Sequence, residues 1–234
     1  MSAAFFVTGT DTDVGKTTIA AGLLRAARLA GLSTAAVKPV ASGCEDGAAG
    51  LRNSDALALL AECSLPLSYA EVNPFAFAPA IAPHLAAREA GVPLKVEALA
   101  AAVQAVLAQQ ADFTLVEGAG GWRVPLDGQA TLAELPVALD LPVILVVGVR
   151  LGCINHALLT AEAIARDGLR LAGWVANVLD PQTSRLDDNL RTLTERLAAP
   201  CLGRVPRLQQ ADAAAVARHL NISLLGLAPA SVGL

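Results

Sequence analysis

The sequence predicts an α/β fold in which a mostly parallel central sheet is flanked by helices on both faces. Short apolar segments alternate along the chain with longer amphipathic ones, which is the pattern of repeated strand–helix units. Residues 113–116 and 143–147 are apolar almost without interruption. A strand has this character when helices cover both of its faces and neither face meets water. The length of 234 residues fits one domain over residues 1–234.

The elements of this fold can be assigned in chain order. Six apolar segments are predicted to form the sheet, namely residues 4–8, 34–38, 113–117, 143–147, 171–177 and 201–205. Helices are predicted where apolar residues recur at helical spacing, over residues 17–32, 96–110, 154–167 and 184–198. Gly31 is a candidate stop for the first helix. Residues 41–88 are the least regular, with a short helix over residues 54–63 capped by Asn53 or Ser54.

The composition argues against several classes of partner. Hydrophobic residues make up 54% of the chain and charged residues 16%, which is enough apolar material for a buried core. Aromatic residues make up 3% and the net charge is −4, so we expect no nucleic-acid partner and no anionic membrane partner. The most apolar run, residues 141–149, is too short to span a bilayer.

The cysteines and the first residues indicate a cytoplasmic protein. The four cysteines are scattered and form no C-x-x-C pair, so we expect reduced thiols at Cys44, Cys63, Cys153 and Cys201. Residues 1–7 lack a basic region and are predicted to be a first strand instead of a signal peptide.

Residues 9–18 carry the most specific motif in the chain. Gly9 follows the first apolar strand, and Gly15-Lys16-Thr17-Thr18 opens an amphipathic helix. This is the context of a P-loop, although five residues separate Gly9 from Gly15 where four are usual. Gly15 allows the backbone close to phosphate groups, Lys16 can reach the β- and γ-phosphates, and the Thr17 hydroxyl can bind Mg²⁺. The sequence therefore predicts a P-loop NTPase-like fold that binds ATP and Mg²⁺.

Two charged residues stand at the ends of other predicted strands. Glu117 leads into the glycine-rich residues 118–121, and Lys38 precedes Pro39. Ligands of open parallel sheets gather beyond the carboxyl ends of the strands. We therefore expect the Glu117 carboxylate to hold Mg²⁺, the glycine-loop N–H groups to face an anion, and Lys38 to point into the crevice of Lys16.

Several of these candidates also have an ordinary structural interpretation. Glu117 could face solvent in a turn, and Lys38 could be a surface lysine at a strand end. By itself Asp55 is an ordinary first-turn helix acid, favoured there by the helix dipole. No metal-ligand spacing occurs among the histidines, and no nucleophile paired with a base can be identified.

Six segments together resemble the dethiobiotin synthetases. They follow the order of that family and span about residues 6–206, and the segments are residues 7–17, 38–43, 53–56, 116–121, 151–157 and 173–177. The resemblance implies an ATP-dependent enzyme that closes the ureido ring of dethiobiotin. One amine of 7,8-diaminononanoate takes up CO₂ as a carbamate, ATP phosphorylates the carbamate, and the second amine closes the ring. The resemblance also implies a homodimer with its sites at the interface.

Residue roles follow from the same resemblance. Lys16 and Lys38 are the implied catalytic residues, and the implied Mg²⁺ ligands are Thr17, Asp55 and Glu117. The implied nucleotide contacts, in which Asn177 reads the adenine edge, are Asp13, Val14, Gly15, Lys16, Thr17, Thr18, Asp55, Glu117, Gly118, Ala119, Gly120, Asn177 and Pro206. The implied contacts to the diamine are Thr12, Lys38, Ser42, Gly118 and Gly121, and the substrate carboxylate is received across the interface by Gly152, Cys153, Ile154 and Asn155.

The chain departs from the family pattern at two places. Gln210 stands near where family members often carry an acid, which leaves the adenine contacts and the nucleotide preference open. The loop of residues 44–50 also differs from the common family versions.

Two other P-loop classes are weaker alternatives. A cobyrinate diamide synthase-like ligase usually appends a glutamine-hydrolysing domain, for which this chain has no room. A regulatory ATPase of the cell-division or partition kind carries a second lysine early in the phosphate loop, whereas this chain has Thr10. Membrane-targeting versions of that class end in a basic amphipathic helix, but residues 222–234 contain no basic residue.

Overall fold

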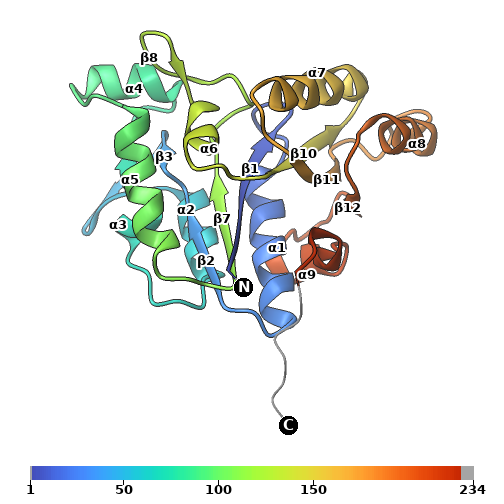
Figure 1. The fold of residues 1–234 in the computed structure, drawn as a ribbon, viewed down its shortest axis with the longest axis horizontal. Coiled ribbons are helices and arrows are strands. Elements are labelled where there is room, and N and C mark those ends of the chain that lie inside the picture. Colours follow the sequence, from blue (N-terminus) through green and yellow to red (C-terminus); the bar gives the residue numbers. More distant parts are fainter. Residues whose placement is uncertain (1, 228–234) are drawn as a thin grey trace.

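A six-stranded sheet forms the centre of the computed structural model, which describes residues 2–227. Its neighbouring strands are all parallel and lie in the order β12-β11-β10-β1-β7-β2, with β12 and β2 at opposite ends (Figure 1). The six predicted strands are confirmed as β1 (Ala3–Gly9), β2 (Thr34–Val37), β7 (Phe113–Glu117), β10 (Val143–Val149), β11 (Leu171–Val178) and β12 (Cys201–Val205).

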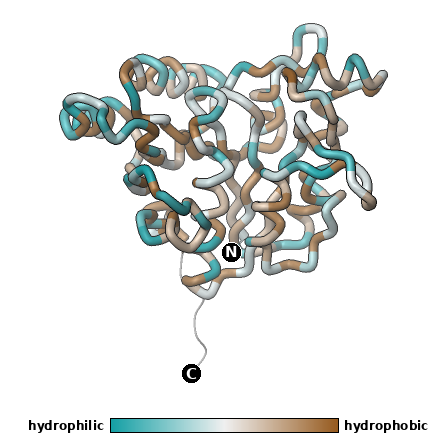
Figure 2. Tube along the Cα trace, turned by 180° about the vertical axis from the view of Figure 1, so that it is seen from behind, coloured by the Kyte–Doolittle hydropathy of each residue, from teal (hydrophilic) through white to brown (hydrophobic). Residues whose placement is uncertain are grey.

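Both faces of this sheet are buried, as the apolar strands predicted. Ile144 and Val146 of β10 belong to the larger apolar cluster, while Leu145 and Val147 belong to a second cluster with residues of α7 (Cys153–Arg166). Successive side chains of a strand point to opposite faces, so the alternation places one cluster on each side of β10. Figure 2 shows hydrophobic residues concentrated in the central strands, with hydrophilic ones mainly at the periphery.

The four predicted helices between the strands are also present. They are α1 (Lys16–Leu29), α5 (Val96–Leu107), α7 and α8 (Leu186–Arg196), and no end differs from its predicted bound by more than three residues. Gly31 does end the first helix: its φ is +82°, its N–H donates to the Arg28 carbonyl, and the Leu32 N–H donates to the Ala27 carbonyl. This paired bonding of the last carbonyls requires the left-handed conformation that glycine adopts without strain.

The irregular segment between β2 and α5 folds into short elements of its own. The predicted helix here is α2 (Ser54–Ala61), and Asn53 is its N-cap, since its side chain accepts from the N–H groups of Asp55 and Ala56. The other elements of this segment are β3 (Val40–Ala41), β4 (Glu45–Gly47), β5 (Gly50–Arg52), α3 (Tyr69–Val72), β6 (Phe75–Ala76) and α4 (Pro83–Glu89). They are too short to produce a period in the sequence.

The remaining elements lie after β7 and after β12. They are β8 (Pro125–Asp127), β9 (Ala130–Thr131), α6 (Glu134–Ala138), α9 (Ala213–Ala217) and the 3₁₀ turn η1 (Ile222–Leu225). The helix α9 packs against α1 and α7 packs against α8. Within the described residues, no helix has the length and apolar character needed to cross a membrane. All four cysteines are free, as expected.

Candidate active site

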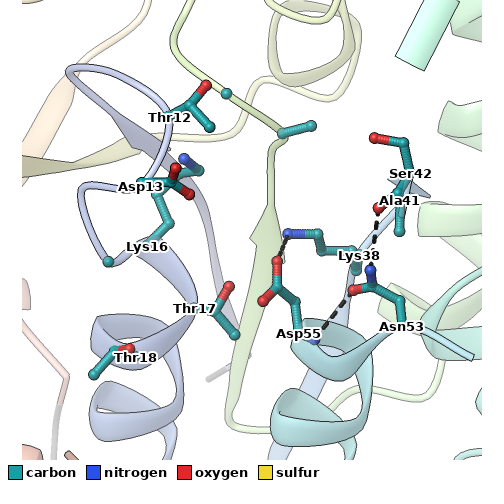
Figure 3. A pocket seen from close by; sticks show the side chains of 13 residues that line it. Thr12, Asp13, Lys16, Thr17, Thr18, Lys38, Ala41, Ser42, Asn53 and Asp55 are labelled. Atoms are coloured by element: carbon teal, nitrogen blue, oxygen red, sulfur yellow. Dashed lines mark hydrogen bonds and ion pairs between the residues drawn. The ribbon is translucent and has the colours of Figure 1, made fainter. Parts of the chain in front are cut away.

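A cavity of about 280 Å³ opens beyond the carboxyl ends of β1 and β2 and the start of α2. Figure 3 shows the phosphate loop on one side of this cavity, facing Lys38 and Asp55 on the other. The lining residues are Thr12, Asp13, Gly15, Lys16, Thr17, Thr18, Lys38, Ala41, Ser42, Asn53, Asp55, Ala119 and Gly120. The structure thus brings together most residues expected at the site, although they come from four separate stretches of the chain.

The phosphate loop leads from β1 into the first turn of α1. Gly15 caps the helix with a φ of +83°, and a Cβ atom there would lie 2.3 Å from Nδ2 of Asn177. The Lys16 Nζ atom donates to the carbonyl of Asp11 at 3.2 Å, so the lysine folds back on its own loop. Helix N-termini leave backbone N–H groups without partners and carry a partial positive charge. The loop therefore combines glycine, lysine and a helix start, as anion binding requires.

Lys38 and Glu117 form a buried ion pair next to this loop. The Lys38 side chain is 5% exposed and the Glu117 side chain 0%. Lys38 Nζ lies 2.5 Å from Oε1 of Glu117 and 2.8 Å from Oδ2 of Asp55. The hydroxyl of Thr17 donates to the same Glu117 oxygen at 2.7 Å. The readings of Lys38 as a surface lysine and of Glu117 as a solvent-facing acid are therefore wrong.

The pKa values in this cluster follow from burial and from the neighbouring charges. Burial lowers the pKa of Lys16, and the nearby Lys38 charge lowers it further. Burial alone would lower the pKa of Lys38, but the Glu117 and Asp55 charges outweigh burial and raise that pKa. Burial alone would raise the pKa of Asp55, yet the adjacent Lys38 leaves it below its usual value. Lys38 and Asp55 are therefore both ionised near neutral pH.

The residues expected to hold Mg²⁺ fit a magnesium ion. Oε2 of Glu117 is buried and has no hydrogen-bond partner within the described residues, which is costly for a carboxylate oxygen. The other carboxylate oxygen of Glu117, Oε1, accepts from the Thr17 hydroxyl. The half-exposed Asp55 side chain lies nearby, in contact with Lys38. Oxygen ligands from one or two carboxylates, completed by phosphate and water, are what Mg²⁺ takes. Among residues 2–227, no three or more His, Cys, Asp and Glu side chains are grouped so that they could hold a metal ion by themselves.

Several expected site residues lie outside the cavity wall. The Asn177 side chain sits below the phosphate loop, where Nδ2 donates to the Val14 carbonyl at 2.8 Å. Pro206 directly follows β12. Gly152 is the N-cap of α7, with a φ of +93°, and Asn155 is exposed in its first turn. The roles expected for these residues stay predictions.

The glycine loop after β7 corrects one expectation. We expected the N–H groups from Gly118 onward to be available to an anionic ligand. The Gly118 N–H instead donates to the Val7 carbonyl at 2.9 Å, because it continues the pairing of β7 with β1. Ala119 and Gly120 do line the cavity, and Gly121 adjoins the Gly9 carbonyl.

Two residues line the cavity without having been predicted to do so. Asn53 is the predicted helix cap, and it also lines the cavity and donates from Nδ2 to the Ser42 carbonyl at 3.3 Å. Ala41 lines the cavity between Lys38 and Ser42. Both lie in segments that resemble the dethiobiotin synthetases, Ala41 in residues 38–43 and Asn53 in residues 53–56.

The fold and this site define a P-loop nucleotide-binding protein of the α/β class. A family model described as an AAA domain matches residues 3–215. An ATP-dependent dethiobiotin synthetase BioD from Pseudomonas aeruginosa (strain UCBPP-PA14) is 74% identical over 224 residues, which cover 96% of this chain and 98% of that protein. The protein of the same name from Cellvibrio japonicus is 60% identical over 95% of this chain and 97% of its own length. The chain belongs to the ATP-dependent dethiobiotin synthetase family.

Two solved structures with a similar fold carry names of other functional classes. A ParA family ATPase from Chlorobium tepidum covers 99% of this chain and 95% of its own, with a TM-score of 0.54 and 17% identity. The MinC:MinD cell division protein complex of Aquifex aeolicus matches over 95% of this chain and 88% of its own, with a TM-score of 0.54 and 17% identity. At such identities the likeness is one of fold. The chain is 74% identical to a dethiobiotin synthetase and 17% identical to the ParA family ATPase, so the alternative of a regulatory ATPase is not favoured.

Proposed function

We propose that this chain converts 7,8-diaminononanoate, CO₂ and ATP into dethiobiotin, ADP and phosphate. The observation that carries the proposal is the buried Lys38, held between Glu117 and Asp55 on the same cavity as the P-loop Lys16. A phosphate loop alone serves any nucleotide hydrolase. A second lysine across the cavity supplies positive charge for another anion, as a carbamate substrate requires.

The proposed reaction has three bond-forming steps. In the first, one amine of the diamine forms a C–N bond to CO₂ and releases a proton, which gives a carbamate. A carbamate oxygen then attacks the γ-phosphorus of ATP, so that an O–P bond forms and ADP leaves. Finally, the second amine attacks the carbamate carbon, the C–O bond breaks, and phosphate leaves as the ureido ring closes.

In the second step each lysine would stabilise a different negative charge. Lys16 lies at the start of α1 and can release the Asp11 carbonyl to bind the transferring phosphoryl group. Lys38 faces the cavity from the other side and can hold the carbamate oxygens, with Ser42 beside it. When bound with ATP, Mg²⁺ would be held by Thr17, Asp55 and Glu117 and would neutralise phosphate charge. Both lysines must be positioned before the reaction starts, since preorganised charge is what lowers the barrier.

A homodimer is part of this proposal. Two large apolar side chains are exposed on α7 and the turn before it, Leu151 at 94% and Leu159 at 56%. Such a patch next to the N-terminus of a helix fits a subunit interface that also binds an anion. The substrate carboxylate would then reach Gly152–Asn155 of the second subunit. The free thiols at all four cysteines agree with the cytoplasmic location that we propose.

The decisive experiment is to measure ATP turnover with and without the diamine. We expect phosphate release to require both the diamine and bicarbonate, and dethiobiotin to appear in equal amount by mass spectrometry. ATP turnover that is indifferent to the diamine would refute the proposal and favour a regulatory ATPase.

A further inference from the structure

Two side chains outside the cavity connect residues that line it. Neither Tyr69 nor Asn73 belongs to the cavity wall, and both come from the short helix α3 and its C-cap. Asn73 is 3% exposed, and a buried polar side chain is retained only where its hydrogen bonds are satisfied. The partners of Asn73 and Tyr69 therefore indicate what the two residues do.

Asn73 holds the backbone of Lys38. Its Nδ2 atom donates to the Lys38 carbonyl at 2.8 Å, and the Lys38 N–H donates to the Val72 carbonyl at 2.6 Å. This contact matters because β2 ends at Val37 and its pairing with β7 stops there. Pro39 has no N–H of its own to donate. The position of Lys38 beyond the sheet therefore depends on the α3 segment.

Tyr69 extends this contact to the helix that carries Asp55. The Tyr69 hydroxyl donates to Oδ1 of Asn73 at 3.0 Å and accepts from the Asn53 N–H at 2.7 Å. Asn53 in turn caps α2 through the N–H of Asp55 at 3.1 Å and donates to the Ser42 carbonyl at 3.3 Å. One hydroxyl thus completes a chain of hydrogen bonds that joins Lys38, Ser42 and Asp55.

We propose that Tyr69 and Asn73 are positioning residues that set the distance between Lys38 and Asp55 and so fix the magnesium and carbamate sites relative to each other. The inference rests on the proposed function for its kinetic readout. The Lys38–Asp55 contact of 2.8 Å joins a buried lysine to an acid that is 44% exposed, so burial alone does not hold Asp55 in place. A misplacement of about 1 Å at a reacting group can cost about a hundredfold in rate.

The test is Tyr69→Phe, which removes the hydroxyl and keeps the ring. The ring also carries the Arg52 guanidinium, whose central carbon lies 4.2 Å from the ring centroid, and phenylalanine preserves that contact. We expect kcat to fall about tenfold or more, with the KM for ATP within about twofold of wild type, because the phosphate loop is untouched.

A binding measurement provides a readout that does not need turnover. ADP binding is followed by calorimetry over a series of Mg²⁺ concentrations. We expect Tyr69→Phe to raise the Mg²⁺ concentration needed for half-maximal binding by about tenfold, since the Asp55 oxygen no longer sits at a fixed place. Binding without Mg²⁺ should stay as in wild type.

Ser33→Ala is the matched control. The Ser33 hydroxyl also donates and accepts, to the Asp112 carboxylate at 2.6 Å and from the Asp112 N–H at 2.9 Å, and it stands just before β2 at the end remote from Lys38. This variant should lose stability but keep wild-type kcat and Mg²⁺ dependence. A second variant, Asn73→Leu, should change both quantities in the same direction as Tyr69→Phe.

The outcomes separate the two proposals. If Tyr69→Phe, folded by circular dichroism, has wild-type kcat and wild-type Mg²⁺ dependence, the positioning role is overturned. If Ser33→Ala changes the same quantities as Tyr69→Phe, the effect is general destabilisation and the role is also overturned. If the wild-type protein makes no dethiobiotin, the proposed function fails, while the Mg²⁺-dependent ADP binding still decides the role of Tyr69.

Discussion

At the residue scale, Lys38 is the residue on which the site depends. Its ammonium group is held between two carboxylates, and one of them, Glu117, is fully buried. A buried charge costs several kcal/mol unless it is paired, so Lys38 has a structural role as the ion-pair partner of Glu117 beside the catalytic role that we propose for it. Removal of Lys38 is expected to lower turnover. The burial of Glu117 predicts a loss of stability as well.

Replacing Lys38 separates these two roles. We expect Lys38→Met to lower turnover by about a hundredfold or more, as loss of a preorganised charge does. The same change should lower the free energy of unfolding by about 3–5 kcal/mol, because Glu117 is left as an unpaired buried charge. The double variant Lys38→Met/Glu117→Gln should regain most of the stability in urea unfolding and none of the turnover. A single variant as stable as the double variant would contradict this account.

The pH dependence of stability tests the Lys38–Asp55 contact. Because the pKa of Asp55 is lowered in the folded protein, its contribution is complete above the ordinary aspartate pKa of about 3.9 and is lost as pH falls through the lower folded value. The pKa of Lys38 is raised, so its contribution is complete below the ordinary lysine pKa of about 10.4 and is lost as pH rises through the higher folded value. Between these limits both charges are present.

We therefore expect the stability difference between wild type and Asp55→Asn to be constant from about pH 5 to pH 9 and to shrink below about pH 4. Urea unfolding at a series of pH values measures it. Asp187→Asn is the control, since Asp187 pairs with Arg204 at the surface and its side chain is 80% exposed. A difference that already shrinks at pH 6 would mean that Lys38 does not hold Asp55 ionised.

At the element scale, the segment that follows the glycine loop after β7 is hydrogen-bonded to the end of α7, a helix far from it in the sequence. The Trp122 Nε1 atom donates to the Asp167 carboxylate at 2.8 Å, at the C-cap of α7, and Arg123 pairs with the same carboxylate at 2.7 Å. The Trp122 ring packs edge-on against Phe6 of β1, with centroids 6.0 Å apart. A loop rich in glycine has little stiffness of its own. These contacts supply the stiffness that Ala119 and Gly120 need at the cavity wall.

Trp122→Phe removes the indole N–H and keeps an aromatic ring. We expect the KM for the diamine to rise about tenfold, because the loop that we propose faces the diamine is less well placed, and the free energy of unfolding to fall by about 1–3 kcal/mol. Asp167→Ala should have the same effects. Asp187→Ala breaks a comparable aspartate–arginine pair far from the loop and should leave KM unchanged. Steady-state kinetics measure this KM. If the KM for the diamine is unchanged in Trp122→Phe, the loop is held in place by other contacts.

At the scale of the whole molecule, the proposed dimer makes a prediction about mixtures. If each cavity combines Lys38 of one chain with Asn155 of the other, the variants Lys38→Met and Asn155→Ala damage different halves of each site. A dimer containing one chain of each variant then has one intact site and one doubly damaged site. Random exchange of subunits should restore about a quarter of the wild-type turnover to two weakly active parents.

The mixing experiment has a built-in control. Lys38→Met mixed with Thr17→Ala should not recover, because both residues line the cavity of one chain. Leu159→Glu should give monomers by sedimentation equilibrium, since a charge replaces a side chain of the exposed apolar face. If the mixture stays at the level of its parents while heterodimers form, Asn155 does not serve the partner's site.

Local spacing in the sequence was sufficient for the sheet, the four main helices and the phosphate loop. The apolar runs of β10, the helical period of α1 and the Gly15-Lys16-Thr17 step each lie within a few neighbouring residues. Such signals depend on what a short segment must bury or bind, so the segment itself carries them. The resemblance to a family added Asp55, whose own sequence context marked it only as a helix acid.

Tertiary structure alone decided how these parts meet. The Asn177 amide bonds to the phosphate loop, and the Tyr69 hydroxyl links Asn73 to Asn53. The Gly118 N–H donates to β1 and so is not available to a ligand. Each of these bonds joins residues that are apart in the chain. The physical reason is that each backbone or side-chain polar group satisfies its hydrogen bonds with whatever the packed fold brings near it. A period or a motif records which residues are available, and packing determines which of them become partners.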